Sequence, residues 1–525
     1  MCPSAPASSN TASPFLRLHE SDTVVVARDF APAGTAWTSP DGHVSVTARE
    51  RIDLGHKMAI RSFAKGETLL KFGQPIGFAT QPIAAGDWVH SHNLDMEALE
   101  RDFEFGTAIH ELPKPKEQRF FQGYRRADGR AATRNYVAVV TTVNCSATSA
   151  NFIVDAFDKS ILEQFPNIDG VIALNHKSGC SFRYTGPDHE MLSRTLSGFA
   201  KHPNIVAYII LGLGCETGQA GYLAEHYDLV TLNGSGERNN RPLVINIQDV
   251  GGVKKTVNYA IGALKELLPA ANNVQRVPIP ISELILGTNC GGSDGHSGIT
   301  ANPALGVASD LLVAHGGTSA LAETTEIYGG EHLLTRRAVS RAVGEKLIER
   351  IRWWEEYSAK FNTRIDNNPS VGNKKGGLTT IFEKSLGAIA KGGIAPLTAV
   401  YEYSEPMTEK GFVIMDTPGF DPASVTGLVA GGANIVVFTT GRGSCFGCKP
   451  VPSIKVSTNT PVYERMIDDM DLNAGTITDG VKSVEEVGHE IFEMMIAVAS
   501  GQKTKSEEQG IGDEEFCPWM PGPIF

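Results

Sequence analysis

From Asn135 onward, short apolar runs alternate with amphipathic segments. Strands are predicted at 136–143, 170–174 and 205–211, and helices at about 146–162, 188–202 and 251–270. The alternation resumes after residue 398, with strands at 411–415 and 434–439 and helices near 422–430 and 484–499. A helix that connects two parallel strands packs back onto the sheet, so this pattern is typical of a mainly parallel sheet. It predicts an α/β fold for most of the chain.

Residues 15–95 follow a different pattern. Short runs rich in Val, Thr and Gly lie between turn signals such as Ala64-Lys65-Gly66-Glu67, which is typical of a small all-β module. The last run ends in histidines two residues apart, His90 and His92. Residues two apart on a strand share a face, so these histidines are candidate metal ligands, with His56 as a third. Two solvated histidines at the end of a strand would give the same pattern.

Two segments lack this organisation, and composition limits the partners. Residues 1–14 are small and polar and are expected to form a flexible tail, and residues 96–123 are expected to form a linker.

The net charge of −12 argues against a nucleic acid or an anionic membrane as partner. Because no apolar run could span a bilayer and no signal peptide is recognised, we expect a cytoplasmic protein whose eight cysteines are not cross-linked.

Four of the cysteines come just after predicted strands. They are Cys145, Cys180, Cys215 and Cys290. The carboxyl ends of parallel strands meet at one edge of a sheet, where such folds bind ligands, so we expect the four thiols to converge there. A separate pair, Cys445 and Cys448, is typical of a redox pair or half a zinc site, but no second pair with this spacing follows.

Polar, glycine-rich turns follow other predicted strands. The longest runs from Cys290 to Pro303 and contains Gly291-Gly292-Ser293-Asp294, although an ordinary strand-to-helix loop could have this composition. The others are 322–326 with Glu323 and Glu326, 366–377 with Asn373 and Lys374, and 441–448 with Arg442. Neither the dinucleotide fingerprint nor the P-loop is matched.

Taken together, these residues resemble the family of sugar-acid dehydratases that includes altronate dehydratase and galactarate dehydratase. The resemblance covers most of the chain, from Gly55-His56-Lys57 and His90-Ser91-His92-Asn93 to Asp471-x-Asn473-Ala474-Gly475. Its longest motifs are Gly212–Glu216, Cys290–Pro303, Asn368–Lys374 and Thr439–Gly443. It implies an N-terminal β-clip module of the SAF type at 15–95, a central α/β domain at 124–397 and a C-terminal Rossmann-like α/β domain at 398–525. The segment Ser444–Lys449 departs from the family pattern, which leaves the substrate open.

The resemblance also implies a hydro-lyase reaction. Water is removed from a galactarate- or altronate-type acid to give a 2-keto-3-deoxy acid, and a divalent metal takes part. We expect this metal to be Fe²⁺, with Mn²⁺ or Mg²⁺ as alternatives. Such a reaction needs a base for the proton next to the carboxylate, an ion that stabilises the enediolate, and an acid for the leaving hydroxyl. For partners, we expect the sugar acid and a second copy of the chain in a homodimer.

Our hypothesis assigns these roles to the strand-end residues. His90 and His92 hold the metal, and His176 is the general base or acid with Glu216 or Glu326 as partner or further ligand. Lys374 and Arg442, with the backbone of Gly291–Gly292, bind the carboxylates, and Ser293, Asp294 and Asn373 are further contacts.

Three alternatives remain open. Cys145, Cys180, Cys215 and Cys290, or three of them, could hold an iron–sulfur cluster. A lyase that expels another leaving group, such as sulfite from a sulfolactate-like acid, would share the proton chemistry. A sugar-acid sensor without catalysis is the non-enzyme alternative, but binding alone would need fewer ionisable groups.

Overall fold

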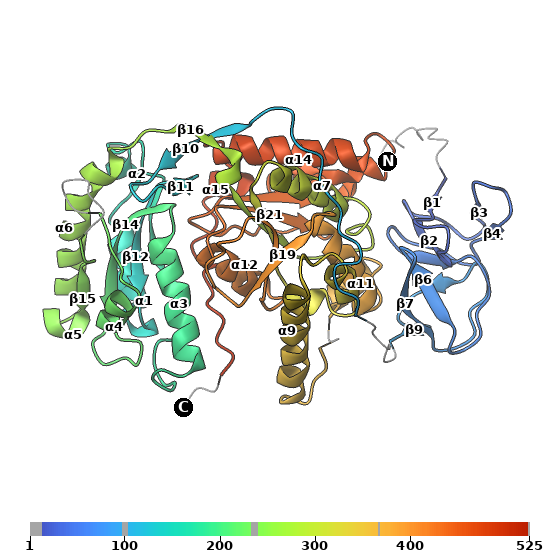
Figure 1. Cartoon of the computed structure of the whole chain (residues 1–525), viewed down its shortest axis with the longest axis horizontal. Coiled ribbons are helices and arrows are strands. Elements are labelled where there is room, and N and C mark those ends of the chain that lie inside the picture. Colours follow the sequence, from blue (N-terminus) through green and yellow to red (C-terminus); the bar gives the residue numbers. More distant parts are fainter. Residues whose placement is uncertain (1–12, 97–102, 233–239, 366–367, 523–525) are drawn as a thin grey trace, which may run out of the picture.

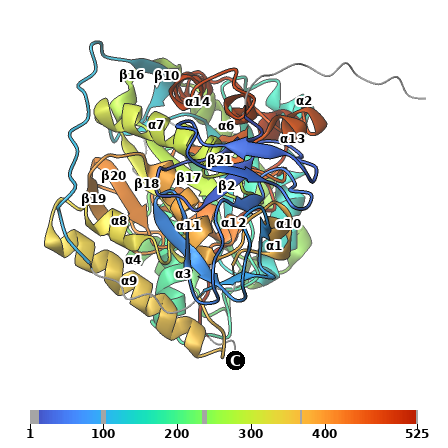
Figure 2. The ribbon, with the colours of Figure 1, turned by 90° about the vertical axis from the view of Figure 1, so that its right-hand side faces the viewer.

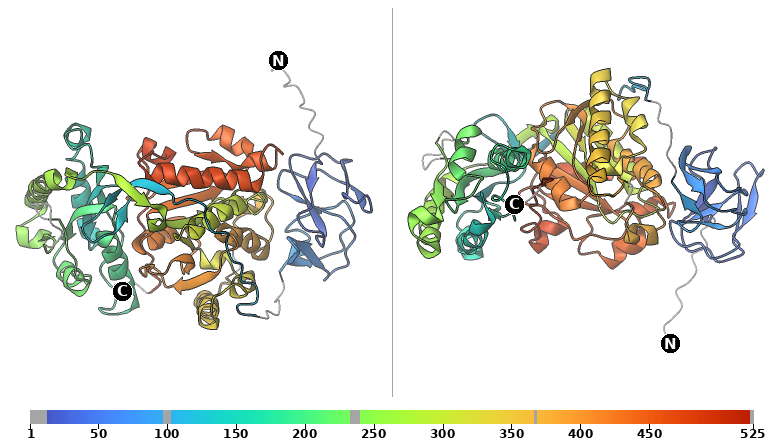
Figure 3. Two further views of the ribbon diagram at one scale, coloured as in Figure 1. Left: turned by 45° about the horizontal axis from the view of Figure 1, so that its top comes forward. Right: turned by 90° about the horizontal axis from the view of Figure 1, so that it is seen from below.

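The computed structural model describes residues 13–96, 103–232, 240–365 and 368–522. Residues 1–12 of the expected tail and 97–102 of the expected linker lie outside this part. Three bodies follow one another along the longest axis, with a four-stranded α/β domain at one end, a seven-stranded α/β domain in the middle and the N-terminal β module at the other end (Figures 1 and 3). In the described part, we find no helix with both the length and the apolar character that a bilayer span requires.

The N-terminal module consists of short antiparallel strands. One sheet has the order β1-β2-β5-β8, a second pairs β3 with β4, and a third has the order β6-β7-β9. The strands are β1 (Phe15–Leu16), β2 (Val24–Ala27), β3 (Ala36–Thr38), β4 (Ser45–Thr47), β5 (Lys57–Ala59), β6 (Thr68–Lys71), β7 (Gln74–Ala79), β8 (Trp88–Val89) and β9 (Leu94–Asp95). Two small apolar cores hold the module together, so the expected all-β module is confirmed.

The four-stranded parallel sheet has the order β13-β12-β14-β15. Its strands are β12 (Tyr136–Thr141), β13 (Gly170–Leu174), β14 (Ile205–Gly212) and β15 (Val244–Asn246). Helices α1 (Asn144–Val154) and α6 (Val253–Asn272) pack on one face of the sheet. Helix α3 (Pro187–Lys201) packs on the other face, and its apolar side also meets helix α12 (Asp421–Ala430) of the middle domain. One apolar core is therefore shared by two domains.

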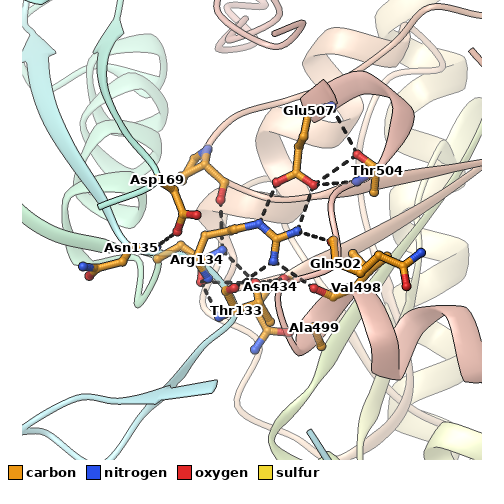
Figure 4. Close-up of polar contacts among 12 residues, drawn as sticks. Thr133, Arg134, Asn135, Asp169, Asn434, Val498, Ala499, Gln502, Thr504 and Glu507 are labelled. Carbon is orange, nitrogen blue, oxygen red and sulfur yellow. Dashed lines mark hydrogen bonds and ion pairs between the residues drawn. The ribbon is translucent and has the colours of Figure 1, made fainter. Parts of the chain in front are cut away.

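A polar joint lies beside this shared core. Its first residues come directly after β11 (Ala131–Ala132). This strand forms a small sheet with β10 (Phe120–Arg125) and β16 (Val277–Pro280). The buried Arg134 guanidinium forms an ion pair with Glu507 at 2.6 Å and donates to the carbonyls of Thr133, Val498 and Gln502 (Figure 4). The start of the four-stranded domain is thus bound to the last helices of the chain.

The middle domain contains a seven-stranded parallel sheet with the order β19-β20-β18-β17-β21-β22-β23. Its strands are β17 (Ile285–Cys290), β18 (Thr318–Leu321), β19 (Leu397–Tyr401), β20 (Gly411–Met415), β21 (Ile435–Thr440), β22 (Ser453–Ser457) and β23 (Leu472–Asn473). The chain starts at the central β17, builds one half of the sheet, and then crosses to β21 to build the other half. Helices α7 (Ala301–Ala314) and α14 (Val484–Ala499) cover one face, and α12 packs on the other.

This topology differs from the expected division between residues 397 and 398. Strands β17 and β18 come before that point and pair directly with β21 and β20, which come after it. The division therefore falls inside one sheet, and the boundary between the α/β domains lies before β17. Alternation of strands and helices looks the same within one sheet and across two, so it does not show which strands pair.

Candidate functional site

A cavity of about 700 Å³ opens at the carboxyl ends of the central strands of the seven-stranded sheet. Cys290 to Gly292 after β17 form part of its wall, together with Glu326 after β18, Asp421 after β20 and Arg442 after β21. The halves of the sheet are built in opposite directions from β17. A crevice at such a reversal of strand order is where open α/β sheets bind ligands.

Beside the cavity lies a charged cluster, defined here as Cys290, Glu323, Glu326, Lys384 and Lys391, of which Cys290, Glu326 and Lys384 line the cavity. All five side chains are buried. The Lys391 ammonium lies 2.6 Å from Glu323 Oε2 and 3.0 Å from Cys290 Sγ. Lys384 donates to Glu326 Oε1 at 2.7 Å and to Asn368 Oδ1 at 3.1 Å, and Asn368 in turn donates to Glu326. The two lysines, one on α11 (Ile381–Ile389) and one just after it, thus face the two glutamates that follow β18.

Burial and crowding shift the pKa values in and beside this cluster. Burial raises the pKa of the Glu323 carboxyl, and nearby Glu326 raises it further, against the opposing effect of Lys391. Burial, with the charges of Glu323 and Glu326, raises the pKa of Asp421 to about 8. Burial lowers the pKa of Lys391, but Cys290 and Glu323 outweigh it, so the net shift is upward. The raised pKa values of Glu323, Asp421 and Lys391 all indicate a surplus of negative charge in and beside the cluster.

The donor atoms of the cluster fit a divalent cation. One ligand atom each from Cys290, Glu323 and Glu326 lie within 4.8 Å of one another. Glu323 Oε1 is buried and finds no hydrogen-bond partner in the described part of the chain, although a buried carboxylate oxygen normally has one. Carboxylate oxygens with one sulfur donor suit a borderline metal ion such as Fe²⁺.

Other polar groups face the open side of the cavity. Asn289 donates to Asp421 Oδ1 at 3.0 Å, which fixes the carboxyl beside Gly291. A Cβ at Gly291 would lie 2.4 Å from Asp421 Oδ2, so a larger residue would displace that carboxyl. The backbone N–H groups of Gly441 and Arg442 donate to Gly292 O, which joins the turns after β21 and β17. Arg442 itself is exposed and lines the cavity.

The backbone at Gly291 does not serve the role expected from the sequence. Its N–H donates to Thr439 O at 3.1 Å and is therefore already bonded within the protein. Ser293 and Asp294 are buried, and Asp294 accepts bonds from Ser297, Thr458 and Asn459, so it braces the turn. Asn373 lines the cavity and donates to Ser293 O at 2.9 Å. Lys374 is half-buried on the neighbouring helix α10 (Val371–Lys375).

The predicted metal histidines instead connect the β module to α10. His90 Nε2 lies 2.9 Å from Lys374 O, and His56 Nε2 lies 3.3 Å from Lys375 O. Because Trp88 donates to His56 Nδ1, that ring carries its proton on Nε2 and donates it to the carbonyl. His92 is exposed, and its ring packs on Trp88. The structure does not bring His90 and His92 together with the charged cluster.

His176 and Glu216 lie in the four-stranded domain, away from the lining of this cavity. His176 is buried, with Nε2 3.0 Å from Thr141 O and Nδ1 accepting from the Ser178 N–H. Glu216 is buried too and accepts from Thr142 Oγ1, Leu213 N and Gly214 N. Both side chains use their polar atoms to brace turns after strands.

The four expected thiols divide between two sheets. Cys145, Cys180 and Cys215 follow neighbouring strands of the four-stranded sheet and are exposed, whereas Cys290 is buried at the end of β17. The expected convergence of all four at one edge is therefore wrong. Cys445 is exposed and Cys448 is buried in the shared apolar core; both are free thiols.

Four residues of the site were not assigned from the sequence. Glu323 was recognised only as part of the turn with Glu326, and Asp421, Lys384 and Lys391 were not considered. Asp421 follows a predicted strand, so the rule used for the cysteines would have found it. Lys384 and Lys391 are seven residues apart, which places both on one side of a helical segment, but only the folded chain shows that this side meets the acids.

Three family profiles cover nearly the whole chain. "Altronate/galactarate dehydratase SAF domain" matches residues 13–97, and "D-galactarate dehydratase/Altronate hydrolase, second domain" matches 123–272. "D-galactarate/Altronate dehydratase, C-terminal" matches 281–524. The last two meet before β17, where the structure also places the boundary.

Whole-chain relatives agree with these profiles. Altronate dehydratase of Bacillus subtilis (strain 168) is 36% identical over 94% of this chain and 96% of its own length. Galactarate dehydratase (L-threo-forming) of Escherichia coli (strain K12) is 35% identical over 97% of both chains. The (2R)-sulfolactate sulfo-lyase subunit beta of Chromohalobacter salexigens is 31% identical over 76% of this chain and 96% of its own. The chain therefore belongs to the altronate/galactarate dehydratase family and is a hydro-lyase.

Proposed function

We propose that the cavity at the carboxyl edge of the seven-stranded sheet dehydrates a sugar acid of the galactarate or altronate type to a 2-keto-3-deoxy acid. The observation that carries this proposal is the buried charged cluster at the reversal of strand order. Buried acids and cations are costly unless they are paired, and perturbed groups of this kind gather at reactive sites.

The open side of the cavity supplies the binding groups. Arg442 offers a guanidinium for the substrate carboxylate, a pairing that is often bidentate. Asn368 also lines the cavity, and its amide is positioned by Lys384 and Glu326 to meet a hydroxyl group.

Two side chains have the positions needed for proton transfer. Asp421 lies beside Gly291 on one wall and takes the proton next to the carboxylate. Lys384 also lines the cavity, as part of the charged cluster, and delivers a proton to the leaving hydroxyl, with Glu326 holding the ammonium in place. Each transfer of this kind contributes about 10²- to 10⁴-fold to a rate.

A divalent cation held by Cys290, Glu323 and Glu326 would supply a Lewis acid for the enediolate. Fe²⁺ remains our expectation for that ion, with Mn²⁺ and Mg²⁺ as alternatives. We keep the proposal that the protein is a homodimer.

The same arrangement would serve a β-elimination that expels sulfite. The similarity to a relative named sulfolactate sulfo-lyase supports this second candidate. It needs the same base but no proton for a hydroxyl group.

A substrate panel tests both functions and the sensor alternative. Purified protein is incubated with Fe²⁺ and with galactarate, altronate, other aldarates and aldonates, or sulfolactate, and 2-keto acid and sulfite are measured. We expect 2-keto acid from at least one sugar acid and none from the Arg442→Gln variant at the same substrate concentration. Binding of a sugar acid without any product would support the sensor and contradict this proposal.

A further inference from the structure

Three free thiols that the cavity does not use lie at the carboxyl edge of the four-stranded sheet. Cys145 lies in the first turn of α1 after β12, Cys180 in the turn after β13, and Cys215 in the turn after β14. The order β13-β12-β14 makes these three strands neighbours. Their carboxyl ends, and the turns that follow, therefore lie side by side.

Hydrogen bonds join the three turns close to each thiol. Asn144, next to Cys145, donates its N–H to Ser178 O at 2.9 Å, and Gly218 donates its N–H to Gly179 O, next to Cys180, at 3.0 Å. Glu216, next to Cys215, accepts from Thr142 Oγ1 at 2.7 Å. Each thiol is thus one residue away from a contact between its own turn and another.

The backbone allows an unusually close approach between two of these turns. Gly179 has φ 105°, and a Cβ there would lie 2.1 Å from Thr142 O and 2.6 Å from Val143 Cα. Only glycine tolerates both this φ and this proximity. The turn that carries Cys180 is therefore held directly against the start of α1, where Cys145 lies.

The surroundings of the thiols leave them accessible and offer polar contacts. All three are exposed. Cys145 lies in the first turn of the 11-residue helix α1, the end of a helix that favours a bound group of negative charge. Gln248, which follows β15, donates its side-chain N–H to Cys215 Sγ at 3.3 Å, a contact that stabilises a metal-bound sulfur.

The spacing of the thiols distinguishes a single ion from a larger group. Among the described residues, Cys290, Glu323 and Glu326 form the group whose three ligand atoms all lie within 4.8 Å of one another, so at least two of the three exposed thiols are farther apart than this. One tetrahedral ion with metal–sulfur bonds of about 2.3 Å needs thiolates closer than this. A cubane cluster distributes its thiolates over separate iron atoms and accepts the wider spacing.

We infer that Cys145, Cys180 and Cys215 bind a [4Fe–4S] cluster, one thiolate to each of three irons, with the fourth iron open to an oxygen ligand such as water or a hydroxy acid. The three thiols lose their protons on binding. Cys290, on the other sheet, does not take part. This centre is separate from the charged cluster, and the inference does not rest on the function proposed for the cavity.

The test uses the full-length protein, purified without oxygen and reconstituted with Fe²⁺ and sulfide. We expect broad visible absorbance and about four acid-labile sulfides per chain, with about four irons beyond the iron that the charged cluster holds. Cys145→Ser, Cys180→Ser and Cys215→Ser should each lower labile sulfide at least fivefold. The matched controls, Cys290→Ser and Cys445→Ser, should keep the labile-sulfide content of the unchanged protein.

Thiol labelling provides a measurement that needs no variant. Reconstitution should protect Cys145, Cys180 and Cys215 from alkylation, while exposed Cys445 stays reactive. A lack of labile sulfide after reconstitution, equal labelling before and after reconstitution, or an unchanged cluster in the triple serine variant would each overturn the inference. None of these measurements uses dehydration, so an inactive protein with a protected cluster would count against the cavity proposal alone.

Discussion

Asp421 is the cavity carboxyl whose surroundings most resemble those of a proton-transfer group. Asn289 fixes one oxygen, and Gly291 leaves room for the other. We expect Asp421→Asn to lower kcat about 10²- to 10⁴-fold, because the amide keeps the shape but cannot take a proton. Steady-state kinetics on the substrate found in the panel would measure this. The control is Asp310→Asn, which changes a half-buried acid outside the cavity. Asp310 accepts hydrogen bonds from the N–H groups of Ile394 and Ala395, and its variant should leave kcat within about twofold. Equal losses in both variants would show that Asp421 does not take part in the reaction.

His90 shows a different kind of perturbed residue, one that holds two parts of the chain together. Burial is the main cause that lowers the pKa of His90 from 6.5 to about 4, and Lys57 and His56 add to it. The ring is neutral in the folded protein, whereas the unfolded chain takes up a proton below pH 6.5. The contribution of His90 to stability is therefore present above about pH 6.5 and is lost as the pH falls toward 4.

Thermal unfolding between pH 7.5 and 4.5 measures this effect. The His90→Gln variant, whose amide can still donate to Lys374 O, should show a smaller loss of Tm across this range than the unchanged protein. His92→Gln, which alters the exposed neighbour, should follow the unchanged protein. If the His92 variant flattens the curve as much as the His90 variant, burial of His90 is not the cause.

The elements that position the site come from distant parts of the sequence. The β module lies against α11, which carries Glu383 and Lys384 (Figure 2). Glu383 is buried between Lys57 of β5 and Lys71 of β6, at 2.9 and 2.8 Å. Burial alone would raise the pKa of the Glu383 carboxyl, but the two lysines outweigh this effect and lower the pKa. The carboxyl is therefore ionised at neutral pH.

Glu383→Gln should therefore weaken the attachment of the module. Removing one partner of a buried ionic group leaves uncompensated charge, and the expected loss in free energy of unfolding is about 3–5 kcal/mol. Urea denaturation and the rate of proteolysis within residues 96–123 would measure it. Glu345→Gln removes the same charge from an exposed pair with Arg341 and should cost less than about 1 kcal/mol. Similar losses in both variants would show that the Lys57–Glu383–Lys71 group does not hold the module.

The sequence predicted these elements better than it predicted their partners. The strands at 170–174 and 411–415 and the helix at 484–499 have the expected bounds, because periodicity is local. The pairing of β17 with β21 is a long-range contact that a local pattern does not encode. Because β17 belongs to that sheet, Cys290 lies on a different sheet from the other three thiols. The Lys384–Glu326 pair joins α11 to the end of β18, a contact that no spacing along the chain encodes.

At the scale of the whole molecule, a small polar joint and a shared apolar core join the two α/β domains. Arg134 donates to three carbonyls and to Glu507 at that joint. Lysine keeps the charge but cannot reproduce the planar fork, so Arg134→Lys leaves several buried carbonyls without a donor.

We expect Arg134→Lys to lower the free energy of unfolding by about 2–4 kcal/mol, because each unpaired buried acceptor costs about 1–3 kcal/mol and part of that cost is relieved by relaxation. Hydrogen exchange should rise at the start of β12 and in residues 498–507. Arg130→Lys, which removes an exposed arginine that pairs with Asp128, should cost less than about 1 kcal/mol. The cavity is lined by residues 290–442, so the Arg134 variant should bind a sugar acid with unchanged affinity below its unfolding transition. A parallel loss of affinity would mean that the four-stranded domain shapes the cavity as well as supporting the domain that contains it.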